Sequence, residues 1–312
     1  MKACIIGASG YTGRELVKLL LAHPRIELSV ITSRSLAGES VEKIIPQVVG
    51  FAHGLSFSNP SVEELCIRQD LDIFFLALPH GTAARYAISL LEANKKIIDL
   101  SADFRLNSPK TYKEFYCGDH PAKELLKTAQ YGLPELYDLS WEKSKLIASP
   151  GCYPTSIIVP LAPLLRNDLL SCKDIVVNSM SGISGAGRNA SEKLLYCERN
   201  ENASAYGLPK HRHLSEIEEQ LSHFADQPVI LSFHPHLAPM NRGICTTISV
   251  PANSQTEISK IYEVWDHLYG ECPFVHVLPT GCFPEVAQVV STNRVDISAH
   301  YDVRTQRVVV CS

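Results

Sequence analysis

Three glycines stand in the segment "IIGASGYTGRELVKLL", between an apolar run that predicts a strand at residues 2–6 and a pattern that predicts a helix at residues 13–21. Glycines in such a turn let backbone N–H groups approach a phosphate closely, and the helix N-terminus adds partial positive charge. The placement of Gly7, Gly10 and Gly13 therefore predicts a phosphate-binding turn at the start of an α/β fold. The alternative is a glycine turn that chain geometry alone requires.

The rest of the first half continues to alternate between strand and helix patterns. Strands are predicted at residues 27–32, 73–77 and 96–99, and a helix at residues 82–93. Parallel strands joined by helices predict a doubly wound, Rossmann-type sheet. We therefore expect residues 1–150 to form a dinucleotide-binding domain of α/β class.

Strand patterns predominate in the second half. They fall at residues 174–180, 229–233, 245–250, 274–278 and 307–310, with helices predicted at 215–224 and 256–269. This arrangement predicts an α+β domain on a large mixed sheet at residues 151–312, which we expect to serve catalysis, substrate binding and oligomerisation. A length of 312 residues suits two domains.

Composition excludes several classes of partner. The formal net charge of -4 provides no basic field to attract nucleic acid or an anionic membrane surface. No apolar segment approaches the roughly 20 residues that span a bilayer. Ten cysteines are scattered without a CxxC pair, which indicates neither a disulfide framework nor a zinc site. We therefore expect a reduced, cytoplasmic protein that acts on a small molecule.

The end of the second predicted strand indicates the nucleotide. An acidic residue there would favour NAD, whereas "VITSRS" provides the hydroxyl of Ser33 and the guanidinium of Arg34. These groups suit an adenosine 2′-phosphate and therefore predict NADP. The alternative for Arg34 is an ordinary solvated surface arginine.

The segment "SPGCYPTS" contains the most notable cysteine. Cys152 follows Pro150 and Gly151 and precedes a predicted helix at residues 155–165. The N-terminus of a helix favours the thiolate form of a nearby cysteine. Cys152 is therefore a candidate nucleophile, and a packed, inert cysteine is the alternative.

An acid–base partner for the thiol is available in "KHRHLSEIEEQL". A histidine, His211 or His213, could take a proton from the thiol and return it, and the carboxylate of Glu216 could fix the tautomer. One alternative is a zinc site formed by both histidines and His236, although no ligand pair has zinc spacing. The other alternative is a pair of surface histidines at a helix start.

A second small-residue loop, "SGISGAGR", follows the predicted strand at 174–180. Such a loop lets the backbone approach a nicotinamide ring or a substrate oxygen, and Arg188 could hold an anion. In isolation the loop would be interpreted as a plain turn.

Eight segments in order along the chain resemble one family. They are "GASGYTG", "ALPHG", "DLSADFRL", "YGLPEL", "PGCYPT", "SGISGAGR", "HRHLSEI" and "PHLAPMNRGI". Together they are similar to the N-acetyl-gamma-glutamyl-phosphate reductases, within the wider aspartate-semialdehyde dehydrogenase-like group. The resemblance implies NADPH-dependent reduction of an acyl phosphate to an aldehyde through a cysteine thioester, in arginine biosynthesis.

The resemblance also implies roles for single residues. Cys152 would be the nucleophile, His211 the acid–base group and Glu216 its helper. Binding roles would fall to three sets of residues: the cofactor phosphates to Gly7, Ser9, Gly10, Tyr11, Thr12, Gly13, Ser33 and Arg34; the nicotinamide to Ser184 and Gly185; and substrate to Arg105, Arg188 and His213. No metal is implied, and the family suggests a homo-oligomer, a dimer or a tetramer.

Three departures from the family pattern keep alternatives open. Ser149 stands where many relatives have asparagine, and Ser215 where they have proline. Family members also continue beyond "VVVCS" with a segment that forms a helix against the cofactor domain. The alternatives are the same chemistry on another acyl phosphate, of aspartyl or aminoadipyl type, and an inactive nucleotide-binding relic.

Overall fold

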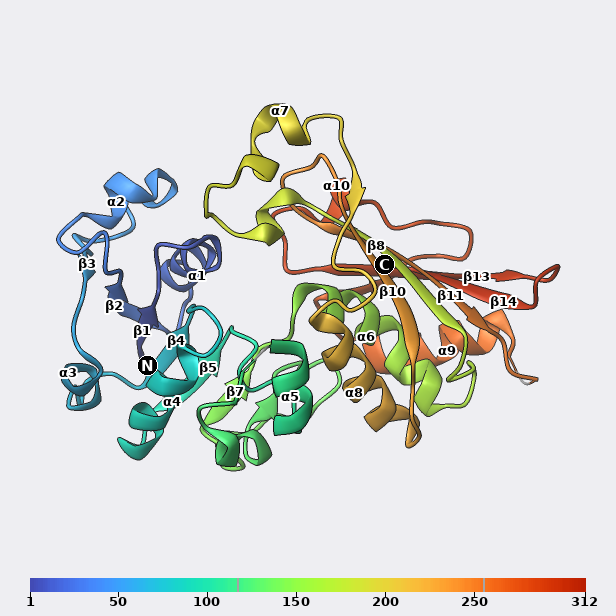
Figure 1. Cartoon of the computed structure of the whole chain (residues 1–312), viewed down its shortest axis with the longest axis horizontal. Helices are drawn as coiled ribbons and strands as arrows, with labels where there is room; N and C mark the ends of the chain where they lie inside the picture. Colours follow the sequence, from blue (N-terminus) through green and yellow to red (C-terminus); the bar gives the residue numbers. More distant parts are fainter. Residues whose placement is uncertain (117, 255) are drawn as a thin grey trace. The chain divides into compact units, whose positions relative to one another are not determined.

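The computed structural model describes residues 1–116, 118–254 and 256–312, so that Cys117 lies outside the described residues. The chain divides into two compact units, Met1–Pro150 and Gly151–Ser312 (Figure 1). Each unit is built on its own seven-stranded sheet. No cysteine among the described residues forms a disulfide bond.

The first unit has a fully parallel sheet with the strand order β3-β2-β1-β4-β5-β7-β6. Its strands are β1 (Lys2–Ile6), β2 (Glu27–Thr32), β3 (Phe57–Ser58), β4 (Ile73–Leu76), β5 (Lys96–Asp99), β6 (Gln130–Tyr131) and β7 (Leu146–Ala148). Its α-helices are α1 (Tyr11–Leu21), α2 (Val41–Ile44), α3 (Val62–Cys66), α4 (Ala83–Glu92) and α5 (Pro109–Tyr116). The predicted doubly wound α/β class is confirmed.

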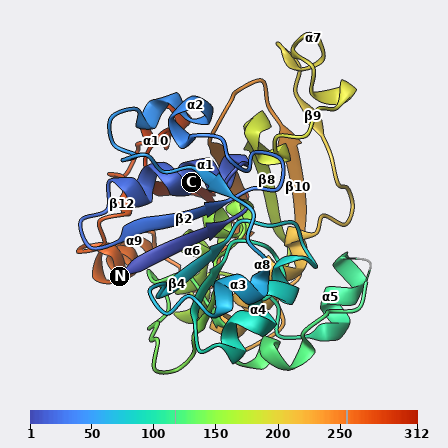
Figure 2. The ribbon, with the colours of Figure 1, turned by 90° about the vertical axis from the view of Figure 1, so that its left-hand side faces the viewer.

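The apolar runs of these strands arise because the sheet is covered on both faces. On β1, Cys4 and Ile6 join the core beneath α3 and α4, whereas Ala3 and Ile5 join the core beneath α1 and α2 (Figure 2). The carboxyl ends of β1, β2 and β4 consequently meet along one edge, where a doubly wound sheet binds ligands.

The second unit has a mixed sheet with the order β12-β13-β14-β11-β8-β10-β9, in which only β8/β10 and β12/β13 run parallel among the described strands. Its strands are β8 (Ile175–Ser181), β9 (Ser204–Ala205), β10 (Leu231–Leu237), β11 (Ile244–Pro251), β12 (Val275–Val277), β13 (Val295–Asp302) and β14 (Arg307–Cys311). Its α-helices are α6 (Cys152–Arg166), α7 (Tyr196–Arg199), α8 (His213–Ala225), α9 (Ile258–Tyr269) and α10 (Val286–Val289). The predicted α+β character with a large mixed sheet is also confirmed.

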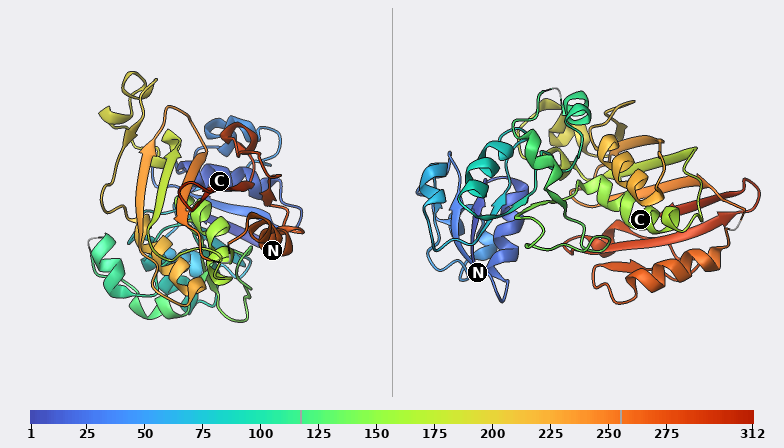
Figure 3. Two further views of the ribbon diagram at one scale, coloured as in Figure 1. Left: turned by 90° about the vertical axis from the view of Figure 1, so that its right-hand side faces the viewer. Right: turned by 90° about the horizontal axis from the view of Figure 1, so that it is seen from below.

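Helices α6, α8 and α9 lie against one face of this second sheet (Figures 1 and 3). Strand residues alternate accordingly: Val177 and Ile248 are buried on the helical side, whereas Met180 and Thr247 are exposed on the other. The second face is therefore partly open to solvent.

Helix α6 contains two interior prolines, Pro160 and Pro163. A proline has no N–H, so the carbonyl four residues earlier loses its helical donor. These carbonyls find donors elsewhere: Tyr269 Oη donates to Val159 O at 2.7 Å, and Ser312 Oγ donates to Ser156 O at 2.6 Å. Tertiary contacts therefore satisfy α6 where its own backbone does not.

Strand β13 (Val295–Asp302) was not predicted from the sequence. Its middle is buried on both faces: Ile297 and Ala299 point to one side of the sheet, and the polar Asp296 and Ser298 point to the other. Asp296 is paired with Arg294 at 2.6 Å, and the pairing accounts for a charge in this position. Apolar and polar residues nevertheless alternate along Val295–Asp302, so the segment carries a strand pattern that the prediction overlooked.

Candidate active site

The glycine turn lies at the carboxyl end of β1 and packs without room for side chains. A Cβ added at Gly7, whose φ is +93°, would lie 2.4 Å from the carbonyl oxygen of Ala77. A Cβ added at Gly13 would lie 2.5 Å from the carbonyl oxygen of Gly7. These two glycines are therefore required by close backbone packing within the turn.

Gly10 has the opposite environment. It is the N-cap of α1, and an added Cβ would meet nothing within 4 Å. The first turn of α1 has no acidic side chain, and both Tyr11 and Thr12 are exposed there. An open helix N-terminus of this kind fits a phosphate. Ser9 belongs to the same turn, where its carbonyl accepts a hydrogen bond from Arg14 Nε at 3.2 Å.

The two residues predicted to select the nucleotide lie just after β2, on the same sheet edge as the glycine turn. Ser33 is buried, and its backbone N–H donates to Ser58 O at 2.9 Å. Arg34 is exposed, so its guanidinium can reach an anionic ligand. The donor set fits a 2′-phosphate better than a free ribose hydroxyl.

The segments "ALPHG" and "DLSADFRL" form one buried network in the first unit. The carboxylate of Asp103 accepts hydrogen bonds from Gly81 N at 2.7 Å, Ala84 N at 2.9 Å and Tyr112 Oη at 2.9 Å. Asp103 thereby fixes the loop that follows β4, and this loop touches the glycine turn through Ala77. The two motifs therefore shape the carboxyl edge of the sheet.

Arg105, which was predicted to bind substrate, is buried in the first unit. Its Nε donates to Ser149 O at 2.7 Å and its Nη2 to Leu100 O at 3.0 Å. The guanidinium therefore joins the backbone just before the "PGC" turn to the backbone just after β5. Nearby, burial raises the pKa of Asp99 to about 7.

Cys152 is the first residue of α6 and is exposed. Gly151 is the N-cap of the helix, and the first turn has no acidic side chain of its own. Amide N–H groups at such a helix start stabilise a thiolate. Cys4 shows the contrasting case, since burial raises its thiol pKa to about 12. Of these two cysteines, only Cys152 has an environment that suits a nucleophile.

The ring of His211 is surrounded by aromatic rings within the second unit. The ring centroids of Tyr206, Phe233 and Tyr153 lie 5.4, 5.5 and 5.8 Å from it, and that of His213 lies 5.0 Å away. We call these four residues the aromatic cage. Burial in the cage, with a smaller effect of Arg212, lowers the pKa of His211 to about 4. The imidazole is consequently neutral near pH 7.

The tautomer of the neutral ring follows from one hydrogen bond. The Nδ1 atom of His211 accepts the backbone N–H of His213 at 3.1 Å. A nitrogen that accepts carries no proton, so the proton lies on Nε2. His211 therefore presents an Nε2–H donor.

Two further residues of the predicted site lie in the first turn of α8. Glu216 is fully buried, and its Oε1 accepts the backbone N–H of Gly151 at 2.8 Å. His213 is also buried, with its ring against His211 and Tyr153. The helper role of Glu216 toward His211 remains a prediction. The contact described here connects Glu216 to the turn that carries Cys152.

The loops "SGISGAGR" and "PHLAPMNRGI" pack together backbone to backbone. Ile183 N donates to Met240 O at 2.9 Å, and Ser184 N donates to Asn241 O at 3.1 Å. A Cβ at Gly182 would lie 2.6 Å from Arg242 N, which explains the glycine. The exposed residues Gly185 and Arg188 follow Ser184 in this loop.

Sequence reasoning did not identify three members of the cage or the glycine beside it. Tyr206 Oη donates to Tyr153 Oη at 3.1 Å, which joins two rings separated by 53 positions. Gly207, with a φ of +64°, lies so close to His211 that an added Cβ would be 2.8 Å from its Cδ2. Phe233 lies within an ordinary strand pattern. The one sequence signal for this packing is the segment "AYGLP", which places an aromatic residue and a glycine just before "KHRH".

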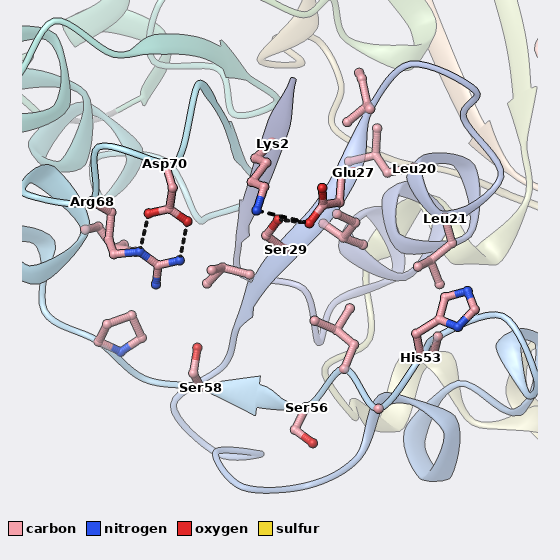
Figure 4. A pocket seen from close by; sticks show the side chains of 18 of the residues that line it. Lys2, Leu20, Leu21, Glu27, Ser29, His53, Ser56, Ser58, Arg68 and Asp70 are labelled. Carbon is pink, nitrogen blue, oxygen red and sulfur yellow. Dashed lines mark hydrogen bonds and ion pairs between the residues drawn. The ribbon is translucent and has the colours of Figure 1, made fainter.

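A cavity of about 1160 Å³ in the first unit lies away from these residues (Figure 4). Four of its charged side chains are already paired: Lys2 Nζ lies 3.4 Å from Glu27 Oε1, and Arg68 Nε donates to Asp70 Oδ1 at 2.6 Å. Lys2 and Glu27 begin their strands, so the cavity is at the amino ends of β1 and β2. The glycine turn lies at the opposite ends.

The described part of the chain contains no group of three or more His, Cys, Asp or Glu side chains arranged to hold a metal ion. The zinc alternative for His211, His213 and His236 therefore has no support there. Within the same residues, no helix is both long and apolar enough to cross a membrane.

The partly buried, neutral side chain of His211 predicts how the stability of the fold depends on pH. The unfolded chain binds a proton at this residue near pH 6.5, but the folded protein does so only near pH 4. Between these values the unfolded state binds more protons, so acidification destabilises the fold. Between pH 7 and pH 4.5 the parent protein should lose more free energy of unfolding than His211→Gln does. We expect the difference to be about 1 to 2 kcal/mol, allowing for solvent screening. Urea titrations of both proteins at the two pH values measure the free energies of unfolding. Equal losses in the parent and the variant would contradict the assignment of a lowered pKa to His211.

Comparison with known proteins gives two family matches. "Semialdehyde dehydrogenase, NAD binding domain" matches residues 2–143, and "Semialdehyde dehydrogenase, dimerisation domain" matches residues 152–312. Two relatives named N-acetyl-gamma-glutamyl-phosphate reductase, from Akkermansia muciniphila and Desulfotalea psychrophila, are each 46% identical to this chain. The alignments cover 100% of this chain and 90% and 89% of the respective relatives.

Solved structures with similar folds are aspartate-semialdehyde dehydrogenases. The Vibrio cholerae enzyme II complexed with ASA has a TM-score of 0.71 at 13% identity, covering 99% of this chain and 91% of that one. The Candida albicans enzyme with NADP has a TM-score of 0.66 at 14% identity, covering 100% and 92%. At such identities the likeness establishes the fold.

Proposed function

The chain belongs to the N-acetyl-gamma-glutamyl-phosphate reductase family, and on this basis we propose that it reduces N-acetyl-gamma-glutamyl phosphate with NADPH. The products are N-acetylglutamate 5-semialdehyde and phosphate, in the arginine biosynthesis of the cytoplasm. The observation that carries the proposal is the exposed Cys152 at the start of α6, directly followed by Tyr153 of the cage around His211.

The first unit supplies the cofactor site. The backbone from Gly7 to Gly13 and the N-terminus of α1 hold the pyrophosphate, with Ser9, Tyr11 and Thr12 lining the turn. Ser33 and the exposed Arg34 hold the 2′-phosphate, which favours NADP over NAD. A related fold, the Candida albicans enzyme, was solved with NADP. In the second unit, Ser184 and Gly185 offer backbone to the nicotinamide.

Arginines hold the anionic groups of the substrate. Arg188 is exposed on its loop and can pair with a carboxylate or a phosphate. Arg105 already uses two nitrogens on backbone carbonyls, and the remainder of its guanidinium contributes positive charge. The ring of His213 lines the same part of the second unit as His211. These three assignments belong to the proposal.

The first chemical step forms the thioester. The thiolate of Cys152 attacks the acyl carbon, which breaks the bond from that carbon to the phosphate oxygen. Phosphate leaves with the bonding electrons and takes up one proton from solvent. Amide N–H groups at the start of α6 keep the sulfur anionic before the attack.

The Nε2–H of His211 stabilises both tetrahedral intermediates of the reaction by donating a hydrogen bond. Negative charge develops on the acyl oxygen when sulfur adds, and it develops again when hydride adds to the thioester. A neutral imidazole donor placed at that oxygen stabilises each stage, as preorganised donors do in oxyanion holes. NADPH supplies the hydride when bound. Collapse of the second stage then releases the aldehyde and returns the Cys152 thiolate.

The direct test is NADP reduction in the reverse direction. Purified chain is mixed with N-acetylglutamate 5-semialdehyde, phosphate and NADP, and absorbance at the NADPH wavelength is followed. Aspartate semialdehyde and aminoadipate semialdehyde serve as matched controls. We expect turnover with the first substrate alone, and turnover only with a control would reassign the substrate. Binding of NADP without turnover of any aldehyde would support the relic alternative.

The packing of Gly207 on His211 predicts a further effect on turnover. In Gly207→Ala the new Cβ presses on the rigid imidazole ring, so we expect kcat to fall by roughly 10²-fold. Gly281→Ala is the matched control, because Gly281 has a φ of +90° but an added Cβ meets nothing within 4 Å. Steady-state kinetics of both variants measure the effect. Equal kcat values would show that the packing does not matter for catalysis.

The open face of the second sheet is proposed as the surface on which a second copy packs. Residues 152–312 match a domain described by its dimerisation, and Met180, 47% exposed, lies on this face near the carboxyl end of β8. Met180→Lys is expected to yield monomers in light scattering because the interface cannot pair the buried ammonium. Val303→Lys, in an exposed turn, is the control. Unchanged assembly in Met180→Lys would exclude this face.

A further inference from the structure

We infer that Glu216 is a positioning residue that fixes the turn carrying the nucleophile, by capping α6 through the Gly151 N–H. The inference rests on the proposed function only in naming Cys152 as the nucleophile. It assigns Glu216 a target other than the His211 helper role that the family resemblance implies.

The geometry of the contact is direct. Glu216 lies in the first turn of α8 with no exposed surface, and its Oε1 is 2.8 Å from Gly151 N. Gly151 is the N-cap of α6 and immediately precedes Cys152. The two partners are 65 positions apart, so the contact forms only when α6 and α8 pack together.

A helix start usually obtains this acceptor from its own sequence. In a capping box, the third helical residue is Glu or Gln, and its side chain accepts the N–H of the N-cap. In α6 that position is Pro154, which has no acceptor side chain, and Gly151 provides no side-chain cap either. Glu216 supplies from a second helix the acceptor that α6 lacks.

This cap matters for the thiol because the residue before Cys152 is a glycine, and glycine has the greatest backbone freedom of all residues. The hydrogen bond removes that freedom and sets where the first helical residue projects. Without it, a buried N–H would lose its acceptor and the turn would sample other conformations. A displacement of about 1 Å in a reacting atom is enough to reduce the rate by roughly 10²-fold.

The same helix provides a matched control. Glu218, two residues further on, also accepts a backbone N–H, that of Leu231 at 3.1 Å, at the start of β10. Removing the Glu218 carboxylate removes the same type of hydrogen bond from the same unit. The turn that carries Cys152 is not affected by this change. Glu218→Ala therefore reports the general cost of such a loss.

Three variants separate the hydrogen bond from the charge. Glu216→Gln keeps an oxygen acceptor and removes the charge, Glu216→Asp keeps the charge and is too short to reach, and Glu216→Ala removes both. The readout is the rate at which iodoacetamide alkylates Cys152, quantified on its own peptide so that other thiols do not contribute. Circular dichroism confirms that each variant is folded.

We expect Glu216→Gln to be alkylated at the parent rate or faster, and Glu216→Asp and Glu216→Ala to be alkylated about tenfold more slowly, with Glu218→Ala at the parent rate. If Glu216→Asp reacted like the parent, or if Glu216→Ala and Glu216→Gln reacted equally, the inference would be overturned. Should Glu216→Ala not fold, the comparison of Gln with Asp decides. Alkylation needs no substrate, so a wrong assignment of the reaction would leave this result unaffected.

Discussion

Replacing Cys152 by alanine is expected to reduce turnover of N-acetylglutamate 5-semialdehyde by at least roughly 10⁴-fold, because the thioester cannot form without the sulfur. NADP binding should persist, since the cofactor site of the first unit does not involve this side chain. Fluorescence titration with NADPH, run beside the kinetic assay, separates the two effects.

Cys282→Ala is the control for this prediction. Cys282 is also exposed, but it follows β12 in a segment without proposed chemistry. Its replacement should leave kcat unchanged. Residual activity of Cys152→Ala above a few percent of the parent would mean that another group, or direct hydride attack, carries the reaction.

Gly13→Ala is expected to destabilise the first unit by about 3 kcal/mol or more, because the methyl group would overlap backbone atoms of Gly7 and Ala8 at 2.5 and 2.6 Å. Backbone cannot move aside as a flexible side chain can. The melting temperature should fall by roughly 6 to 12 °C, as measured by calorimetry.

Gly10→Ala in the same turn is expected to behave differently. A Cβ there meets open space and the φ is ordinary at -73°, so the fold should keep its melting temperature. The methyl group would instead occupy the space that a phosphate needs, and NADPH affinity should fall by about tenfold. Loss of stability in Gly10→Ala, or full NADPH affinity, would contradict the proposed cofactor site.

The parts of the fold that the sequence predicted well are those specified locally. Strands β1, β2 and β5 were predicted with their observed bounds because each is a short segment centred on apolar, mostly β-branched residues. Helix α1 begins at Tyr11, before the predicted start at residue 13, because Gly13 lies inside the helix for packing reasons. Glycine lowers helix propensity, and tertiary contact overrode that preference here.

The candidate site divides in the same way. Cys152, His211 and Glu216 could be named because each lies in a short distinctive segment. The cage could not, because Tyr206 and Phe233 meet His211 through packing of a loop, a strand and a helix start. The hydrogen bond between Glu216 and Gly151 joins positions 65 residues apart, so no local sequence pattern predicts it. Such contacts depend on how distant segments pack together, and this packing cannot be predicted from the local patterns of a single sequence.

The two prolines of α6 have a consequence during protein synthesis. The carbonyls of Ser156 and Val159 obtain their donors from Ser312 and Tyr269, 156 and 110 positions later. A ribosome adding about 5–20 residues per second therefore reaches Ser312 roughly 8 to 30 s after α6 has been made. Throughout that interval the carbonyl of Ser156 lacks its donor, so the packing of α6 cannot be completed. We expect the second unit to complete its packing only after Ser312 has been added, whereas residues 1–150 can fold as they emerge.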